Sequence, residues 1–390
     1  MSQKTVIVVG STHLAYRVKI LLNQEEYKVT HIVRDTYATV SSSGSVFAGV
    51  YDIVQNIDLS DVSMIYLLDE QDDCNLQFII AVTAKNKDTS ITAGLSNENI
   101  APHLQSANKN LTVLNAAKIA APAFVAALYE SVTHDVRYTP ASPSVASPVK
   151  DNDMSTIQIM ALSFLSLIII ATVFFHIREG LSWIDSLYFV IVTVATVGYG
   201  DINLAQSSAV SKLFDIGLII ASTFFIWMIF SLTIDHLLKK RARLSLGIRK
   251  YSLRDHVIVC GLGRVGYFIV TELLEKGEKV IVIDTQKDSS FVQYFRARNV
   301  PIYIGDARLP NVLADAGVIH AKAVMSVINN DAVNLEIGLN ARSFQPKLRL
   351  ILRIFDEIMA RDIKEYLDIH LTLSTSAIAD NVFVEMLHKK

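Results

Sequence analysis

Two long stretches of the chain carry no Asp, Glu, Lys or Arg and are apolar on all faces of a helix. They run over 157–177 and 216–234. At 1.5 Å per residue, about 20 such residues cross a bilayer core of roughly 30 Å. The alternative, two buried helices of a large soluble domain, fits less well because such helices need only one apolar stripe. The pattern predicts membrane-spanning helices over 155–177 and 212–237.

A third apolar segment, 183–195, is too short to span and leads into a glycine-rich hexapeptide. Non-helical backbone at membrane depth is tolerated where protein or water lines it, so a pore helix followed by a loop is predicted. The hexapeptide consists of Thr196, Val197, Gly198, Tyr199, Gly200 and Asp201. Backbone carbonyls of its first four residues, repeated around a fourfold axis, would form oxygen rings that replace the hydration shell of K⁺. Gly198 and Gly200 permit the backbone angles that inward carbonyls require, so a selectivity filter is expected over 196–200.

A cationic stretch follows the second predicted span. It comprises Lys239, Lys240, Arg241, Arg243, Arg249 and Lys250. By the positive-inside rule this end is cytoplasmic, and two spans then place both termini in the cytoplasm. The expected location is the inner (plasma) membrane, with a transmembrane pore domain over 154–238 and a basic linker over 239–253.

The segments before and after the pore domain repeat one another. Residues 6–10 correspond to 257–261, and Asn75 corresponds to Asn334. Both copies alternate short β-rich apolar runs with helical segments, the pattern of a parallel sheet wrapped by helices. The predicted fold is multi-domain, an all-α two-helix pore module plus two α/β Rossmann-like domains. The first copy, a proline–serine linker and the second copy are expected at 1–135, 136–153 and 254–390.

The second copy has a glycine turn between a strand and a helix. In Gly261-Leu-Gly263-Arg-Val-Gly266, the first glycine permits the turn, the second lets a pyrophosphate approach the backbone and the third lets helix and strand pack closely. Asp284 ends the next strand, where a carboxylate binds ribose hydroxyls and disfavours a 2′-phosphate. NAD or an adenine nucleotide (AMP, ADP or ATP) is therefore expected rather than NADP. The alternative is a glycine turn kept only for packing.

The expected nucleotide-binding residues all belong to the second copy. They are Gly261, Gly263, Arg264, Val265, Gly266, Asp284, Asp306, Ala307, Arg308 and Arg353. A phosphate or a neighbouring subunit is the expected contact of Arg308.

The first copy lacks most of these features. Its turn is Gly10-Ser-Thr12-His-Leu-Ala15, and Val33 occupies the position of Asp284. It is interpreted as an assembly or regulatory partner, with His13 at the surface rather than a ligand. An acidic cluster is either a divalent-metal site or a solvated loop, the commoner case, and consists of Asp69, Glu70, Asp72 and Asp73.

Residues 183–201 resemble the pore of two-helix prokaryotic potassium channels. In that family four subunits surround one pore, and aromatic residues such as Tyr188 and Phe189 surround the filter tyrosine. The resemblance implies a homotetramer in a lipid bilayer. The hinge glycine of the family's inner helix is absent from its usual place, where Gly217 and Ala221 are the nearest candidates for a gating role.

Both copies resemble the regulator-of-potassium-conductance domain (RCK, KTN or TrkA-N-like). The residues that carry the resemblance are the glycine turn, Gly305-Asp306-Ala307 and Asn334. The resemblance implies a cytoplasmic gating ring of eight such domains, two from each of four chains. Some members bind calcium at positions that here hold Val327, Arg353 and Phe355. Because a hard cation needs oxygen ligands, a calcium site of this type is not expected, and Arg353 would suit a phosphate.

Composition narrows the function classes. Of 390 residues, 51% are hydrophobic and 19% charged, and the net charge of −2 gives no support for nucleic-acid binding. The leading hypothesis is a potassium-selective channel gated by a nucleotide, not an enzyme. A membrane-anchored oxidoreductase would need a substrate domain and a proton-transfer residue beside the nicotinamide, and neither stands out. A membrane-anchored NAD-binding regulatory subunit of a potassium transport system would leave the filter unexplained.

Overall fold

The computed structural model describes residues 4–37, 46–131, 153–245, 247, 250–367, 369 and 371–389. The chain divides into two compact units. The smaller is Val145–Leu246, and the larger combines Met1–Ser144 with Gly247–Lys390. The predicted proline–serine linker, 136–153, lies outside the described residues apart from its last residue, which begins a helix.

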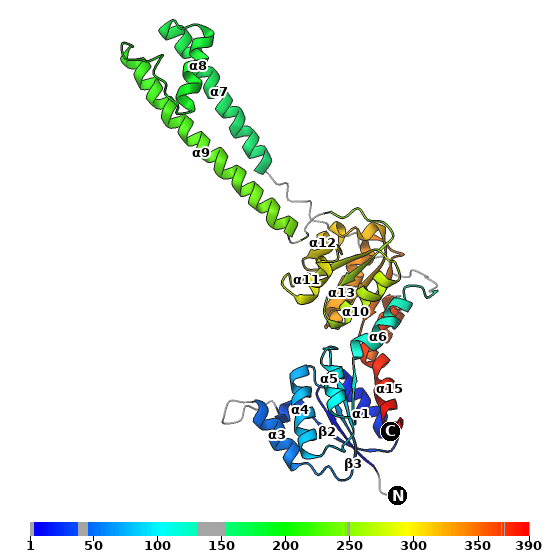
Figure 1. The fold of residues 1–390 in the computed structure, drawn as a ribbon. Helices are drawn as coiled ribbons and strands as arrows, with labels where there is room; N and C mark the ends of the chain where they lie inside the picture. The colour runs from blue at the N-terminus through cyan, green and yellow to red at the C-terminus, as the bar shows by residue number, and fades with distance from the viewer. Residues whose placement is uncertain are drawn as a thin grey trace. The chain divides into compact units, whose positions relative to one another are not determined.

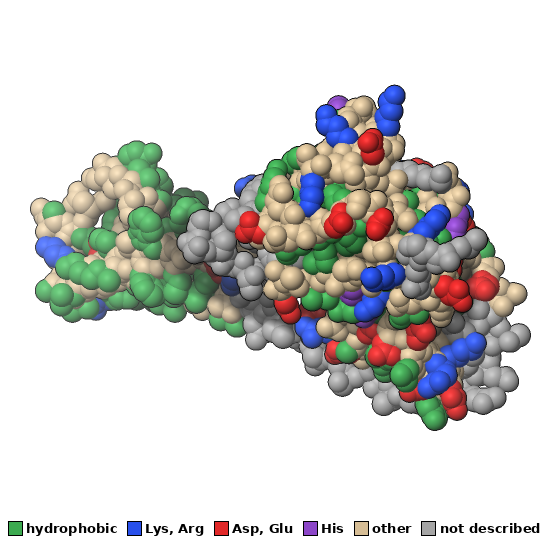
Figure 2. All heavy atoms as spheres, turned by 90° about the horizontal axis from the view of Figure 1, so that it is seen from below, with side chains coloured by type: hydrophobic (Ala, Val, Ile, Leu, Met, Phe, Trp, Pro, Cys, Tyr) green, Lys and Arg blue, Asp and Glu red, His purple; other side chains and the backbone are tan. Residues whose placement is uncertain are grey.

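The described part of the smaller unit consists of the helices α7 (Asp153–Glu179), α8 (Trp183–Val194) and α9 (Ala209–Ser245). Thr156–Glu179 and Ala209–Lys239 have the length and composition of membrane spans, and only 11% of each apolar window is buried within the chain. On the face drawn in Figure 2, hydrophobic side chains cover much of this unit, and Lys, Arg, Asp and Glu side chains are sparse there. Helices that bury so little apolar surface on their own chain fit a lipid environment better than a soluble core.

Helix α8 packs beside the two long helices at one end of the smaller unit (Figure 1). The contact buries a small apolar core that includes Phe175, Phe189, Val190 and Leu218. The rings of Phe175 and Phe189 meet edge to face with centroids 4.9 Å apart, a geometry that aromatic pairs prefer. This core fixes α8 and therefore the start of the segment that follows it.

Helix α9 is longer than the sequence predicts. The inner helix was expected over 212–237 with a linker over 239–253, whereas α9 continues to Ser245. Lys, Arg and Leu favour helix, and Lys239 forms an i,i+4 ion pair with Asp235 at 2.7 Å, a spacing that supports a helix. The first part of the predicted linker is therefore helical.

The larger unit holds a parallel sheet in each copy. Among the described residues, the strand order is β2-β1-β3-β4-β5 in the first copy and β11-β10-β9-β6-β7-β8 in the second. All pairings are parallel. The central strands are buried runs of Val, Ile and Leu, as expected for a sheet with helices on both faces. The two orders agree position by position, and β8 is an additional edge strand of the second copy.

The elements of the first copy are β1 (Thr5–Val9), α1 (His13–Gln24), β2 (Lys28–Ile32), α2 (Arg34–Tyr37), α3 (Val46–Asn56), β3 (Val62–Leu67), α4 (Asp72–Lys85), β4 (Ile91–Gly94), α5 (Ala101–Ala107), β5 (Leu111–Leu114) and α6 (Ala116–Ala126). Those of the second copy are β6 (His256–Cys260), α10 (Arg264–Glu275), β7 (Val280–Asp284), α11 (Ser290–Arg296), β8 (Ile302–Ile304), α12 (Pro310–Asp315), η1 (Val318–His320), β9 (Ala321–Ser326), α13 (Asp331–Phe344), β10 (Arg349–Arg353), α14 (Glu357–Leu367), β11 (Leu371–Leu373) and α15 (Thr375–His388).

One buried asparagine in each copy holds two adjacent strand ends together. Asn75 accepts from the Asp69 amide at 3.0 Å and donates to the Asp69 and Gly94 carbonyls at 3.0 and 2.8 Å. Asn334 accepts from the Ile328 amide at 3.0 Å and donates to the carbonyls of Ile328 and the last residue of β10 at 2.7 and 2.8 Å. Buried amides need such partners, and the matching bonds align the strand ends of the two copies.

The final helix of each copy packs on the other copy. Helix α6 lies on α10, and α15 lies on α1 and α6. The buried core of the second copy includes Phe124 of α6, and that of the first copy includes Phe383 of α15. Arg17 of α1 pairs at 2.6 Å with Asp380 of α15, whose side chain is 1% exposed. The two copies are therefore joined by exchanged helices.

Candidate functional site

The segment after α8 has an unusual backbone. Positive φ angles occur at Thr196 (57°), Gly198 (60°) and Gly200 (78°), whereas Val197 and Tyr199 between them do not have them. Left-handed angles strain residues with a Cβ, and glycine adopts them freely. A chain that alternates between the two hands turns successive carbonyls toward one side, which is the arrangement that an oxygen-lined K⁺ path needs.

Two aromatic residues of α8 have different partners, one just after this segment and one in the core of the smaller unit. The Tyr188 hydroxyl donates to Asp201 at 2.8 Å, and Phe189 packs on Phe175 in the unit's core. Within one chain, neither contact is with Tyr199, whose side chain is 72% exposed. Tyr188 therefore braces the segment at its far end, through the aspartate that follows it.

Gly217 and Ala221 both lie within α9, which is helical throughout its length. A Cβ at Gly217 would meet nothing within 4 Å, so packing within the chain does not require glycine there. Their role in gating stays a prediction.

Each glycine of the second copy's turn has its own local setting. Gly261 has φ 97°, and its amide donates to Ile283 at 2.9 Å, across the top of β6 and β7. A Cβ at Gly266 would lie 2.0 Å from the Gly261 carbonyl oxygen, whereas a Cβ at Gly263 would meet nothing within 4 Å. The third glycine thus permits close helix–strand packing, and the second leaves open backbone that a ligand can approach.

Acidic groups flank this turn. Asp284 ends β7, and its carboxylate accepts from the Leu262 amide at 2.6 Å and the Gln286 amide at 2.7 Å. Asp306 pairs with Arg308 at 2.6 Å, and this guanidinium holds the pKa of the Asp306 carboxyl below its usual range. Arg308 is not among the residues that line the cavity beside the turn, so its observed partner is Asp306 rather than that space.

A cavity of about 790 Å³ lies between the two copies, within the larger unit. Its lining includes the glycine turn, Asp284, Asp306, Ala307 and Arg353 of the second copy, and Thr12, His13, Arg34, Asp69 and Glu70 of the first. Ligands of open α/β sheets bind beyond the carboxyl ends of the strands, and here the two sheets share one cavity at these ends. The volume is within the range of small-molecule sites.

Arg353 sits at the end of β10, where the first copy has Gly94. Its guanidinium stacks on Phe355 at 4.3 Å and donates to the Val327 carbonyl at 3.4 Å. Its buried Nε has no hydrogen-bond partner among the described residues, and burial lowers the pKa of the guanidinium to about 10. The group remains a cation at neutral pH and keeps donor capacity for an anion.

The first copy contributes more to the cavity than the sequence indicates. His13 is exposed, yet its ring stacks on Phe355 of the second copy, with centroids 4.7 Å apart and planes 10° apart. Both terminal nitrogens of Arg264 donate to the Glu70 carbonyl at 3.0 Å. These contacts join positions far apart in the sequence, and no motif indicates them.

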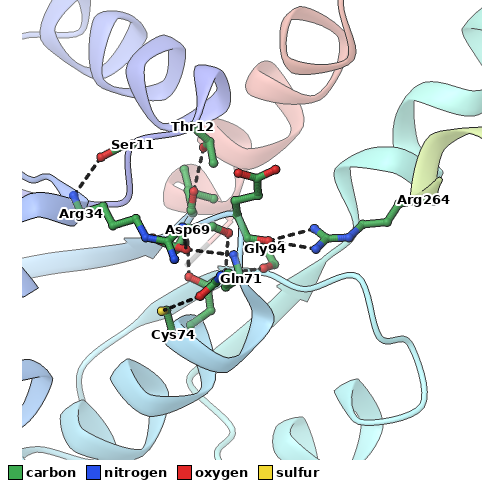
Figure 3. Close-up of polar contacts among 11 residues, drawn as sticks. Ser11, Thr12, Arg34, Asp69, Gln71, Cys74, Gly94 and Arg264 are labelled. Carbon is green, nitrogen blue, oxygen red and sulfur yellow. Dashed lines mark hydrogen bonds and ion pairs between the residues drawn. The ribbon is translucent and has the colours of Figure 1, made fainter. Parts of the chain in front are cut away.

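Two of the four residues in the acidic cluster of the first copy, Asp69 and Asp72, contact other groups of the protein, and Figure 3 shows Asp69. The Asp69 side chain is 1% exposed and lies 3.6 Å from the Arg34 guanidinium. Asp72 accepts from the amides of Ser96 and Asn97 at 3.0 Å each. A solvated loop therefore describes these two aspartates poorly, because their oxygens hold neighbouring parts of the fold together.

Thr12 replaces the second glycine of the turn in the first copy. Its hydroxyl donates to Leu68 at 2.7 Å and accepts from the Ala15 amide at 3.2 Å, so it caps α1. A side chain at this position stands where a pyrophosphate would approach the backbone. The structure therefore agrees with the loss of a dinucleotide-type turn in the first copy.

Two family models match parts of the chain. A model described as ion channel matches residues 162–239, and a TrkA-N domain model matches residues 257–374. The first covers most of the two long helices and the segment between them, and the second covers most of the second copy.

Several curated proteins are similar to the chain. It is 26% identical over 212 residues to probable potassium channel protein 2 of Methanocaldococcus jannaschii, covering 53% of this chain and 61% of that one. It is 27% identical to the voltage-gated potassium channel Kch of Escherichia coli, covering 47% and 44%. It is 31% identical to the glutathione-regulated potassium-efflux system protein KefC of Salmonella newport, covering 29% and 17%. The chain thus spans only part of each relative, and these relatives are potassium transport proteins, not enzymes.

Solved structures share the fold at low identity. The GsuK channel has a TM-score of 0.57 at 14% identity, covering 99% of this chain and 64% of that one. GsuK bound to ADP has a TM-score of 0.53 at 14% identity, covering 100% and 70%. At this identity the likeness concerns the fold alone.

Proposed function

We propose that the chain is the subunit of a potassium-selective channel. The observation that carries this proposal is the backbone of residues 196–200, in which every second residue has a left-handed φ angle. This segment follows the short helix α8, which lies between two long apolar helices in the chain. Carbonyls turned to one side at successive levels are a K⁺ pathway when several chains surround an axis. The ion-channel model that matches residues 162–239 and the similarity to potassium channels support this assignment.

The channel is proposed to be a homotetramer in the inner (plasma) membrane, with both termini cytoplasmic. One chain offers a single carbonyl at each level, whereas a dehydrated K⁺ needs a ring of them. Val197 and Tyr199 are 50% and 72% exposed in the single chain, an exposure that neighbouring subunits would reduce. The cationic residues after the second span support the orientation.

The second copy is proposed to bind NAD or an adenine nucleotide as a gating ligand. Gly263 offers open backbone at the start of α10, and Asp284 holds a carboxylate beside the turn. A helix N-terminus favours the phosphates and the carboxylate favours ribose hydroxyls. The ADP complex of GsuK, a protein of the same fold, supports this ligand class. Eight copies from four chains would form the regulatory ring.

Rubidium flux through the purified protein in liposomes tests both parts. We expect K⁺-selective uptake that changes on addition of at least one of NAD, AMP, ADP and ATP. Calorimetry on the same preparation measures binding, and Asp284→Ala should weaken it by roughly tenfold or more because a charged hydrogen-bond acceptor is lost. Absence of flux under all conditions refutes the channel, and flux indifferent to all four nucleotides refutes this gating ligand.

A second candidate is a membrane-anchored regulatory subunit of a separate potassium transport system, favoured by the likeness to KefC. The variant Gly198→Asp distinguishes the two. In a channel it abolishes flux and leaves nucleotide binding intact, because the filter and the nucleotide cavity belong to different units. A regulatory subunit would show no flux of its own in the wild type either.

A further inference from the structure

The cavity between the two copies offers positions for phosphate groups at the helix starts in its lining. Helices α1, α6, α10 and α15 begin there, and each has its first residue in the lining. A helix N-terminus carries partial positive charge, so four of them converge on one space. Arg264 and Arg353 add two cations from the second copy. The lining also holds four carboxylates, of which Asp69 pairs with Arg34 and Asp306 with Arg308. Phosphate groups of a ligand therefore fit best at the helix starts beside the arginines.

Arg264 connects the glycine turn to the first copy. It is the first residue of α10, and its side chain is exposed. Both of its terminal nitrogens donate to a single acceptor, the Glu70 carbonyl oxygen, at 3.0 Å. A guanidinium normally engages an anion through two parallel bonds, so a neutral carbonyl uses only part of its bonding capacity.

The loop that presents the Glu70 carbonyl is held firmly (Figure 3). The Asp69 carboxylate accepts from the Gln71 amide at 2.9 Å, and the buried Asn75 bonds both the amide and the carbonyl of Asp69 at 3.0 Å. The acceptor is therefore rigid, whereas the donor is a long, exposed side chain. A change at this contact comes most readily from movement of Arg264.

We infer that Arg264 senses the ligand's phosphate: its guanidinium leaves the Glu70 carbonyl and binds the phosphate instead. This inference rests on the proposed nucleotide site. A phosphate carries a full negative charge and offers the guanidinium two parallel bonds, which a single carbonyl oxygen does not, so a phosphate at the start of α10 draws the guanidinium away. The loop 69–71 of the first copy then loses its contact with the glycine turn. The copies stay joined, because α6 and α15 continue to pack across them.

This exchange lets Arg264 distinguish ligands with a phosphate from ligands without one, and it passes the difference to the first copy. Adenosine offers no phosphate and leaves the Glu70 contact in place, whereas ADP disrupts it. A ligand shifts an equilibrium only through different affinities for its two states. The phosphate thus supplies the energy difference that the first copy detects.

Hydrogen–deuterium exchange of the full-length chain in lipid nanodiscs tests the inference, with ADP and adenosine as probes and binding measured in parallel. Saturating ADP should speed exchange of the amides around 69–75 by about tenfold, and adenosine should not. In Arg264→Ala, exchange should already be fast without ligand and unchanged by ADP. ADP affinity should fall in that variant while adenosine affinity stays the same.

Arg361→Ala is the matched control, since Arg361 is an exposed arginine of α14 outside the cavity lining, and it should behave as wild type. If ADP binds the wild type and the loop amides do not respond, or respond equally to adenosine, the inference is wrong and the nucleotide site stands. If neither AMP, ADP, ATP nor NAD binds, the nucleotide site and the inference fail together.

Discussion

Replacing Gly198 by Ala tests the proposed ion pathway with a change of one methyl group. Gly198 has φ 60°, and a Cβ there would meet nothing within 4 Å in the chain. The methyl group therefore adds no clash within the subunit. Its cost is the left-handed backbone, about 1–2 kcal/mol for an L-residue. Four subunits share one filter in the proposed tetramer, so the total is about 4–8 kcal/mol.

Gly180, in the loop between α7 and α8, provides a matched control. It has φ 67° and equally open surroundings, so Gly180→Ala introduces the same backbone strain outside the filter. Both variants should lose a similar amount of thermal stability. Ion transport should differ between them, because a filter must keep its backbone angles in all four subunits. Each 1.4 kcal/mol of strain lowers the population of the conducting filter about tenfold.

The assay is rubidium uptake into liposomes, with sodium as the competing ion. We expect Gly198→Ala to lower selective uptake by more than roughly a hundredfold and Gly180→Ala to preserve it. Equal loss in both variants would show that strain anywhere in the smaller unit blocks transport. Normal selectivity in Gly198→Ala would mean that the carbonyls of 196–200 do not form the pathway.

Three further changes probe the larger unit. Gly266→Ala should abolish ADP binding in calorimetry and lower the thermal midpoint, because its Cβ would lie 2.0 Å from the Gly261 carbonyl; unchanged binding would contradict the close packing. Asp380→Asn should destabilise the joined copies by about 1–3 kcal/mol, since Arg17 loses a buried partner; adding Arg17→Ala should cost little more, because the remaining partner of Arg17 is the exposed Glu357. Burial lowers the pKa of His256 from 6.5, so the unfolded chain binds the proton first. The thermal midpoint should therefore fall as pH drops below about 6.5, and His256→Gln should weaken this dependence.

Local sequence patterns predicted the helices and strands well where one physical requirement dominated. Uncharged runs of membrane-span length indicated α7 and α9 because a backbone in lipid must bond within its own helix. The end of α9 was not predicted, since a cationic run is compatible with either a linker or a helix, and ion pairs such as Lys239 with Asp235 decide between them. Short apolar runs that alternate with helical segments likewise indicated two parallel sheets, and both are present.

The candidate nucleotide site was only partly predictable. The glycine turn and Asp284 lie within one strand–turn–helix–strand unit, so their spacing carries information. His13 was interpreted as a plain surface residue, and it is exposed, but its stacking on Phe355 depends on the other copy. For Arg308 a phosphate or a neighbouring subunit was the expected contact. Within one chain it pairs with Asp306, and that expectation stays a prediction.

By itself, the sequence determined the features that depend on residues close together in the chain. These are two helices long enough to span a bilayer, the Thr-Val-Gly-Tyr-Gly loop and the glycine turn. The tertiary structure alone decided which distant groups meet. Arg264 and Glu70 lie 194 positions apart, and Arg17 and Asp380 lie 363 apart. They come together because the last helix of each copy packs on the other copy, and no spacing within the chain encodes that exchange.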